Sequence, residues 1–407
     1  MITLIKYEVL KLFKRVKTLV VVIAFMLLTM VLAFGLYKDS ESMKRYSSPE
    51  FQIENMERNI SSNEKQKENL PPDVRNDASK KEEYLKNLDA DTARLKNDIS
   101  KLKALNGKQV DWKEDLNTRI KDLETTLNET QGDFKESNGD LQQQLQELKY
   151  LRDNNIKPIP DYEFNAFSYL EKLISILGQV FLIIGIAIFA ADMVSGECTP
   201  PTLKLLLTQP VSRGKVIFSK FISVTLAAIG LILSIEIVSF LVVGLIYGFG
   251  NSTYPVMVGA KYQFNQAVFL ENGGHPLNII AGSSHIIPMW KYMIELLLTQ
   301  GLYILACTSF VFLVSTLFKS SMVSMGVATV SLIAMTIVFN LVGFLKKFAM
   351  YVFTSYIDMG AVIKGQTALM FNDPSSTFGL AIIVLLVWTV VCYVISHIVF
   401  TKKDILI

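Results

Sequence analysis

The sequence predicts an all-α polytopic membrane protein with six transmembrane helices and a large extracytoplasmic helical coiled-coil insertion between helices 1 and 2. Hydrophobic residues make up 51% of the 407 residues and the mean hydropathy is +0.35, which is too apolar for an ordinary soluble domain. Six apolar runs are long enough to cross a bilayer as helices. Between the first two runs lies one long charged segment, which predicts the insertion.

Charge is unevenly divided along the chain. Residues 38–168 contain 22 Lys and Arg against 27 Asp and Glu, a net charge of −5, whereas the remainder contains 18 and 10, a net charge of +8. The chain therefore combines a basic membrane portion with one acidic, soluble insertion. Its basic residues flank apolar runs instead of forming one soluble face, so no nucleic-acid partner is expected. Cys198, Cys307 and Cys392 all lie outside the insertion, so no disulfide framework is expected.

Residues 1–17 predict a cytoplasmic amphipathic helix that lies on the membrane surface, with lipid as its partner. The alternative is a charged lead-in to the first span. Residues 18–37 form that span, and no A-x-A cleavage site follows it, so we interpret it as an uncleaved transmembrane helix. The helical spacing of apolar positions in the first segment is carried by Ile5, Val9, Leu12, Phe13 and Val16.

The insertion, residues 38–168, carries apolar residues three and four positions apart, which is typical of coiled-coil seams. Asn106-Gly107 lies between the first two seams and predicts the tight turn of a helical hairpin. A solvated, partly disordered spacer is the alternative, because short helices are marginal in isolation. An extracytoplasmic partner would bind this domain. The three seams are Leu95, Ile99 and Leu102; Leu116, Ile120, Leu123 and Leu127; and Leu141, Leu145 and Leu148.

The rest of the chain alternates apolar spans with polar connections. Spans 2 to 6 are predicted at 169–191, 221–249, 292–318, 322–345 and 377–400. The connections are a loop at 192–220, a Gly/Pro/Asn-rich loop at 250–291, a broken amphipathic or re-entrant segment at 346–376 and a tail at 401–407.

The distribution of basic residues predicts the orientation. With a cytoplasmic N-terminus, the inner flanks carry twelve Lys and Arg and the outer flanks carry six. Both termini and the loop 192–220 are therefore expected in the cytoplasm, and the segments 250–291 and 346–376 outside. The predicted location is a cell membrane, and more specifically the bacterial cytoplasmic membrane.

Motifs for catalysis are absent from the sequence. Nothing matches G-x-x-x-x-G-K-[ST], H-E-x-x-H or C-x-x-C, so we assign no catalytic residue, no metal site and no cofactor to this chain. His275 and His285 share the outer loop and could ligate a metal together with an external acid. We interpret them as ordinary polar loop residues.

Glu236 lies near the middle of the third predicted span. An ionisable group at that depth is costly unless it faces water, a partner or the bundle interior, so a translocation pathway or an interface is one interpretation. The other is a protonated, hydrogen-bonded packing residue. Gly178, Gly185, Gly230 and Gly244 are interpreted as positions of close helix packing.

The loop 192–220 contains a turn cluster, a short apolar helix and a basic restart of the next span. Asp192 and Glu197 close the second span, and Thr202–Arg213 reads TLKLLLTQPVSR. This arrangement resembles the cytoplasmic loop of ABC-2-type transporter permeases, in which an acidic residue precedes a Thr-Leu-led helix, a proline and a basic restart. Pro201 departs from the glycine usual in that family before the helix. The six-span order and the broken segment before the last span are similar as well.

The resemblance implies a transmembrane subunit that works as a homodimer or heterodimer with a separate ABC ATPase subunit, which carries ATP and Mg. In the family this loop forms a coupling helix that docks in a groove of the ATPase. The contact candidates carried over to this chain are Glu197, Leu203, Leu206, Pro210 and Arg213.

Three hypotheses follow. The chain is the membrane subunit of an ATP-driven exporter, or a signal transmitter that passes ATPase motion to an extracytoplasmic partner through the coiled coil without transport, or a structural anchor. The loop favours the first two. The substrate stays open among ions, peptides, lipids and antibiotics.

Overall fold

A computed structural model describes residues 1–75, 77–105, 111–129, 138–160, 162–179, 181–197, 211–269 and 274–402. The chain divides into two compact units. Unit 1 contains Met1–Phe34, Ile120–Ile156 and Asn165–Ile407, and unit 2 contains Gly35–Arg119 and Lys157–Phe164.

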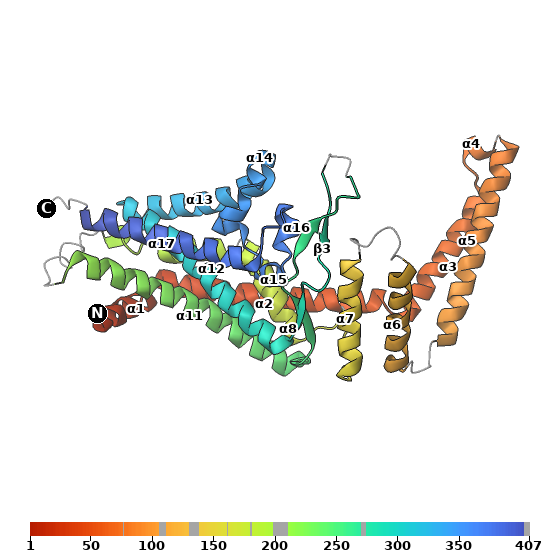
Figure 1. Ribbon diagram of the computed structural model, residues 1–407, viewed down its shortest axis with the longest axis horizontal. Helices are drawn as coiled ribbons and strands as arrows, with labels where there is room; N and C mark the ends of the chain where they lie inside the picture. Colours follow the sequence, from red (N-terminus) through yellow and green to blue (C-terminus); the bar gives the residue numbers. More distant parts are fainter. Residues whose placement is uncertain are drawn as a thin grey trace. The chain divides into compact units, whose positions relative to one another are not determined.

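Long helices dominate unit 1 (Figure 1). Among the described residues, five helices are long and apolar enough to cross a membrane, and the number is up to six if one bent pair forms a single span. The expected helical, polytopic membrane protein is thus confirmed at this level. The five helices are α2 (Val16–Tyr46), α11 (Arg213–Tyr247), α12 (Met289–Leu317), α13 (Ser321–Leu341) and α17 (Phe378–Lys402).

The bent pair occupies the region of the second predicted span. It consists of α8 (Ala166–Gln179) and α9 (Phe181–Ala190), which are bent by 63° relative to each other. A span at 169–191 was expected, and apolar composition alone does not report a bend. The pair therefore has two separately oriented halves.

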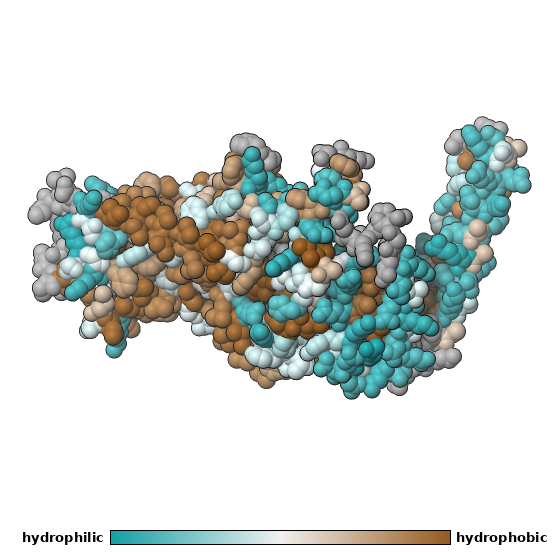
Figure 2. All heavy atoms as spheres, viewed as in Figure 1, coloured by the Kyte–Doolittle hydropathy of each residue, from teal (hydrophilic) through white to brown (hydrophobic). Residues whose placement is uncertain are grey.

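Helix α12 forms the centre of the bundle. In its most apolar window 61% of the residues are buried, against 11% for α2 and 28% for α17. It packs along α9, α11 and α17, and its Tyr303 and Phe312 side chains are fully buried. The outer helices instead expose apolar side chains, as expected of surfaces solvated by lipid tails. Figure 2 shows hydrophobic residues covering these helices and hydrophilic residues covering α3 (Pro49–Glu68) and α5 (Ala78–Leu105).

The segment 250–291 was expected as an outer loop, and its described residues, 250–269 and 274–291, include four short strands. Strand β1 (Pro255–Val258) pairs antiparallel with β4 (His285–Pro288), and β2 (Tyr262–Phe264) pairs antiparallel with β3 (Leu277–Ile279). The runs are too short for a reliable alternating pattern, so their pairing is decided by tertiary contacts. Helix α7 (Gly139–Asp153) packs against β1 and β3.

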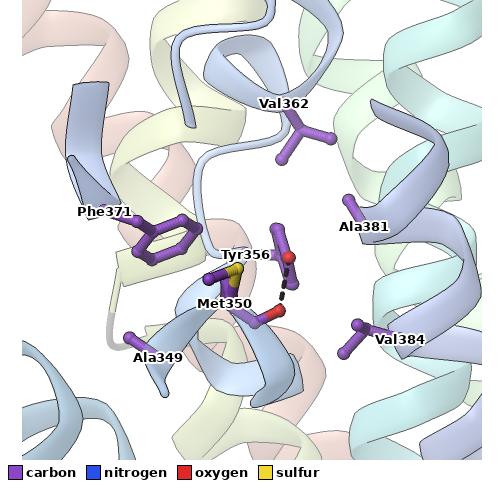
Figure 3. Packing of buried hydrophobic residues seen from close by; sticks show 7 residues of the cluster. All are labelled: Ala349, Met350, Tyr356, Val362, Phe371, Ala381 and Val384. Carbon is purple, nitrogen blue, oxygen red and sulfur yellow. Dashed lines mark hydrogen bonds between the residues drawn. The ribbon is translucent and has the colours of Figure 1, made fainter. Parts of the chain in front are cut away.

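Residues 343–371 fold into short helical elements around a small apolar core (Figure 3). Tyr356 is fully buried there, and its hydroxyl donates to the Met350 carbonyl oxygen at 2.5 Å. Val362, Phe371 and Ala381 complete the surroundings. The elements are α14 (Gly343–Lys346), η3 (Ala349–Tyr351), η4 (Phe353–Ser355), α15 (Met359–Lys364) and α16 (Thr367–Phe371).

Unit 2 is built on an antiparallel pair of helices, α3 and α5, with the short α4 (Pro72–Arg75) between them. Helix α3 begins at a serine cap, since Ser48 Oγ accepts from the Phe51 backbone N–H and Pro49 follows the cap. Polar rungs join the pair at three heights: Asn63 to Asp91, Lys67 to Asp89, and Lys103 to Glu57.

The predicted seam on α5 faces α3. Ile99 and Thr92 are buried, whereas Arg94, Lys96 and Asn97 between them are exposed. The turn expected at Asn106-Gly107 lies outside the described residues. Helix α3 was not expected as the partner, because the polar Asn63 interrupts its apolar stripe. Helix α6 (Trp112–Glu129) contributes residues to both units.

Candidate coupling site

The chain after α9 is anchored to the ends of two other helices. Ser315 Oγ, near the end of α12, accepts from the backbone N–H groups of Val194 and Ser195 at 3.0 and 3.1 Å. Ser324 Oγ, at the start of α13, donates to the Ala191 carbonyl oxygen at 2.6 Å. These bonds satisfy backbone groups that the end of a helix leaves unpaired. They fix the position of η2 (Ser195–Glu197), which lies in the first described part of the loop 192–220.

Four side chains form a buried ion cluster beside η2. Lys220 Nζ, on α11, contacts Glu197 Oε1 at 2.7 Å and Glu8 Oε1 at 2.8 Å. Lys11 Nζ contacts the same Glu197 oxygen at 2.6 Å. Lys220 is 0% exposed and Glu197 is 2% exposed, whereas the Lys11 side chain is 46% exposed. The ion cluster, Glu8, Lys11, Glu197 and Lys220, thus balances two positive and two negative charges.

The ion cluster joins three elements far apart in the sequence: α1 (Ile2–Phe13), η2 and the first turns of α11. A buried ammonium group pays a large desolvation cost, which close ion pairs with good geometry offset. Removing one partner therefore leaves an uncompensated buried charge. Ser223 Oγ also donates to the Ile5 carbonyl oxygen at 3.1 Å, which adds a second link between α1 and α11. The three elements are expected to move together.

A second ion group lies at the junction of α1 and α2. Asp192 Oδ1 contacts Arg15 Nη1 at 3.3 Å and Lys17 Nζ at 3.1 Å. Thr18 Oγ1 donates to the Leu12 carbonyl oxygen at 2.7 Å, which closes the turn between the two helices. These side chains are partly exposed, so the pairs are weaker than those of the ion cluster.

The structure places only two of the five predicted coupling residues. Glu197 is buried and forms ion pairs with Lys11 and Lys220. Arg213 is exposed at the start of α11, and its Nη1 donates to the Thr401 carbonyl oxygen at 3.4 Å near the end of α17. Leu203, Leu206 and Pro210 lie outside the described residues.

Glu236 lies inside the bundle formed by one chain. It is 0% exposed, and Gln300 Nε2 on α12 donates to its Oε1 at 2.7 Å. Nearby, the Tyr169 hydroxyl donates to the Thr29 carbonyl oxygen at 3.3 Å. The Oε1 atom is therefore hydrogen-bonded within the bundle, whereas the buried Oε2 atom has no hydrogen-bond partner among the described residues.

No group of three or more His, Cys, Asp and Glu side chains suited to a metal ion occurs among the described residues. His275 Nδ1 lies 3.0 Å from the carbonyl oxygens of Asn265 and Val268, and His285 belongs to β4. His275 is thus hydrogen-bonded to backbone carbonyl groups of its own loop, and His285 lies in a paired strand.

Comparison with known proteins gives the family of the chain. A family model described as ABC-2 family transporter protein matches residues 2–405. The chain belongs to this family. The ABC-2 family chain is similar to the uncharacterized protein YhcI of Bacillus subtilis (strain 168), with 25% identity over 255 residues. The match covers 60% of this chain and 71% of that protein.

Sequence reasoning missed Glu8 and Lys220 as members of the ion cluster in this ABC-2 family chain. Two signals were available. Glu8 is the single acidic residue in the basic segment 1–17, and Lys220 lies within the apolar run VIFSKFIS. Charges in such surroundings are expected to pair. Which charge pairs with which depends on the packing of α1 on α11, and the sequence does not specify that packing.

Proposed function

We propose that this ABC-2 family chain is the transmembrane subunit of an exporter powered by a separate ABC ATPase subunit. Two such subunits, identical or different, would form the route outward, with ATP and Mg held by the ATPase. The N- and C-termini and the loop 192–220 would lie in the cytoplasm, in agreement with the basic residues that flank this end of the spans.

The observation that carries the proposal is the ion cluster at the base of the loop. Glu197 lies near the start of the loop 192–220, in η2, and Lys220 is its last residue, in the early turns of α11. Their ion pair closes the loop at its base and ties it to α1 through Glu8. A force on the loop would therefore reach α1, α9 and α11 as one body, because packed interfaces switch between discrete arrangements instead of deforming continuously.

Leu203, Leu206, Pro210 and Arg213 are the proposed contacts with the ATPase. Glu197 is proposed as a positioning residue for the same loop, in keeping with its burial. Glu236 is proposed as an internal hydrogen-bonding residue that joins α11 to α12, in keeping with its bond to Gln300.

Docking of the ATPase is tested at Arg213. Arg213→Glu is expected to lower the amount of ATPase subunit that co-purifies with the chain by about tenfold, because a reversed charge at an interface repels the partner. Lys215→Glu is the matched control, since Lys215 is also exposed and lies two residues further along α11. Equal recovery of the ATPase with both variants would remove Arg213 from the interface.

The transmitter hypothesis is tested on the α3–α5 hairpin. Lys103 Nζ and Glu57 Oε1 are 3.3 Å apart, so a short Gly-Ser linker in place of residues 58–102 shortens the hairpin at a rung where its two helices meet. We expect the shortened chain to keep ATP-dependent efflux in liposomes of a compound that stimulates its ATPase. Loss of efflux while ATPase stimulation persists would instead favour a transmitter.

A further inference from the structure

One face of α8 forms a seat for the segment that leads into α15. Glu171, Ser175 and Gly178 are spaced by four and three residues, so they lie on the same side of the helix. They belong to the end of unit 1 that carries the strands and the start of α12, which we call the strand end. The ion cluster lies at the opposite end of α11 and α12 (Figure 1).

Each of these three residues contacts the segment Ile357–Lys364. Glu171 Oε1 accepts from Lys364 Nζ at 2.6 Å, and Ser175 Oγ donates to Asp358 Oδ2 at 3.1 Å. A Cβ atom built on Gly178 would lie 2.5 Å from the Ile357 carbonyl oxygen, so only glycine permits this approach. The seat therefore combines an ion pair, a hydrogen bond and a close backbone contact.

The ion pair is supported by an aromatic side chain at the start of α12. The Tyr292 hydroxyl donates to Glu171 Oε1 at 2.9 Å, and Lys364 Nζ lies 5.5 Å from the centre of the Tyr292 ring. A cation above an aromatic ring is attracted by the ring's electron-rich face. Helices α8, α12 and α15 thus meet at a single Glu–Lys pair.

Helix α15 is a short, well-bounded element. Asp358 Oδ1 accepts from the Ala361 backbone N–H at 3.0 Å as the N-cap, and Gly365 ends the helix in the left-handed conformation. Because the second carboxylate oxygen of Asp358 bonds Ser175, one side chain both caps α15 and attaches it to α8. The helix is therefore suited to move as a rigid piece.

The seat and the ion cluster involve the two helices of the same bent pair. Helix α8 carries Glu171, and α9 runs on to η2 and Glu197. The Lys364 and Glu171 side chains are 30% and 28% exposed, so their pair is partly hydrated and weaker than a fully buried one. A pair of this strength holds two elements together and still separates when one of them is displaced.

We propose that α15 is a latch over the strand end of the bundle, held shut on α8 by the Glu171–Lys364 pair and released when α8 moves during the transport cycle. The release step rests on the proposed function, whereas the closed latch does not. A change in the tilt between α8 and α9 would withdraw Glu171 and Ser175 together from α15.

The test follows the accessibility of position 175. Ser175→Cys provides the labelling site. Cys198→Ser removes a competing thiol, and the two remaining cysteines, Cys307 and Cys392, are buried. The chain, bound to its ATPase in nanodiscs, is labelled with a charged, water-soluble maleimide. In this background Lys364→Met is expected to speed the labelling roughly threefold to tenfold, because one partner of a half-buried ion pair is lost.

Two variants control for general loosening. Lys172→Met removes an exposed lysine next to Glu171 and is expected to leave the labelling rate unchanged. Glu171→Lys combined with Lys364→Glu reverses the pair and is expected to return the rate towards its starting value. Equal labelling of the Lys364→Met and Lys172→Met chains overturns the latch.

A second arm adds a non-hydrolysable ATP analogue to the chain with the intact Glu171–Lys364 pair. Faster labelling is expected, since ATPase closure would release the latch. No response to the analogue, with faster labelling of the Lys364→Met chain, overturns ATP-driven release and counts against the proposed function. Failure of the latch and failure of the proposed function are therefore distinguishable: the first removes the effect of Lys364→Met, and the second removes only the effect of the ATP analogue.

Discussion

Lys220→Met is expected to destabilise the chain by about 3–5 kcal/mol and to abolish the link between ATPase turnover and transport. The substitution keeps most of the side-chain volume but removes the ammonium group between Glu8 and Glu197, whose Oε1 atoms lie 2.8 and 2.7 Å from Lys220 Nζ. Two buried carboxylates would then face each other with only the half-exposed Lys11 to compensate. Thermal unfolding in detergent measures the loss of stability.

Lys215→Met is the matched control, because Lys215 is exposed on the same helix. The triple variant Glu8→Gln, Glu197→Gln and Lys220→Met removes the buried charges together and is expected to recover most of the stability, since well-packed neutral groups replace a buried ion cluster at little cost. If it recovers stability without coupled transport, the ion cluster has a mechanical role as well as a structural one. Unchanged unfolding of the Lys220→Met chain would contradict the assigned contacts.

Gly365→Ala is expected to displace α15 from the strands and to destabilise the chain by about 2–4 kcal/mol. Gly365 has φ +84°, and a Cβ atom there would lie 2.1 Å from the Ala260 carbonyl oxygen. Both effects oppose alanine, and relief requires breaking the bond from the Ala260 backbone N–H to the Lys364 carbonyl oxygen, 3.1 Å long. The unfolding transition in detergent and the labelling rate of Ser175→Cys report the two consequences.

Gly326→Ala provides the comparison. Gly326 lies within α13, and a Cβ atom there meets nothing within 4 Å. Alanine is expected to be neutral or slightly stabilising, because glycine is a poor helix former. Similar losses of stability in the two variants would show that crowding at Ala260 does not explain the effect.

The coupling region shows what could and what could not be predicted from the sequence. The interruption between two spans and its resemblance to a family loop directed attention to residues 192–220. The role of Glu197 within that loop was not predictable in the same way. An acidic residue next to a loop has the same composition whether it contacts a partner or a buried lysine, and only the packing of α1 against α11 shows that it contacts Lys220.

The charged insertion gives a second example. The spacing of Leu95, Ile99 and Leu102 indicated a helix with one apolar face, and α5 has that face. Helix α5 packs against α3, on a side of α3 that contains Asn63. The Asn63 side chain is buried and bonds Asp91. Patterns based on hydrophobicity overlook such a side, because a polar residue within it is counted as exposed.

The sequence alone determined the class of this protein, a mostly helical membrane protein with several long apolar helices, because burial in lipid requires long apolar runs that composition reveals directly. Only the tertiary structure decided the bend between α8 and α9, the pairing of Lys220 with Glu8 and Glu197, and the seat of α15 on α8. Each of these depends on contacts between residues more than twenty positions apart or on the direction in which a helix turns, and neither is encoded in the local periodicity of the chain.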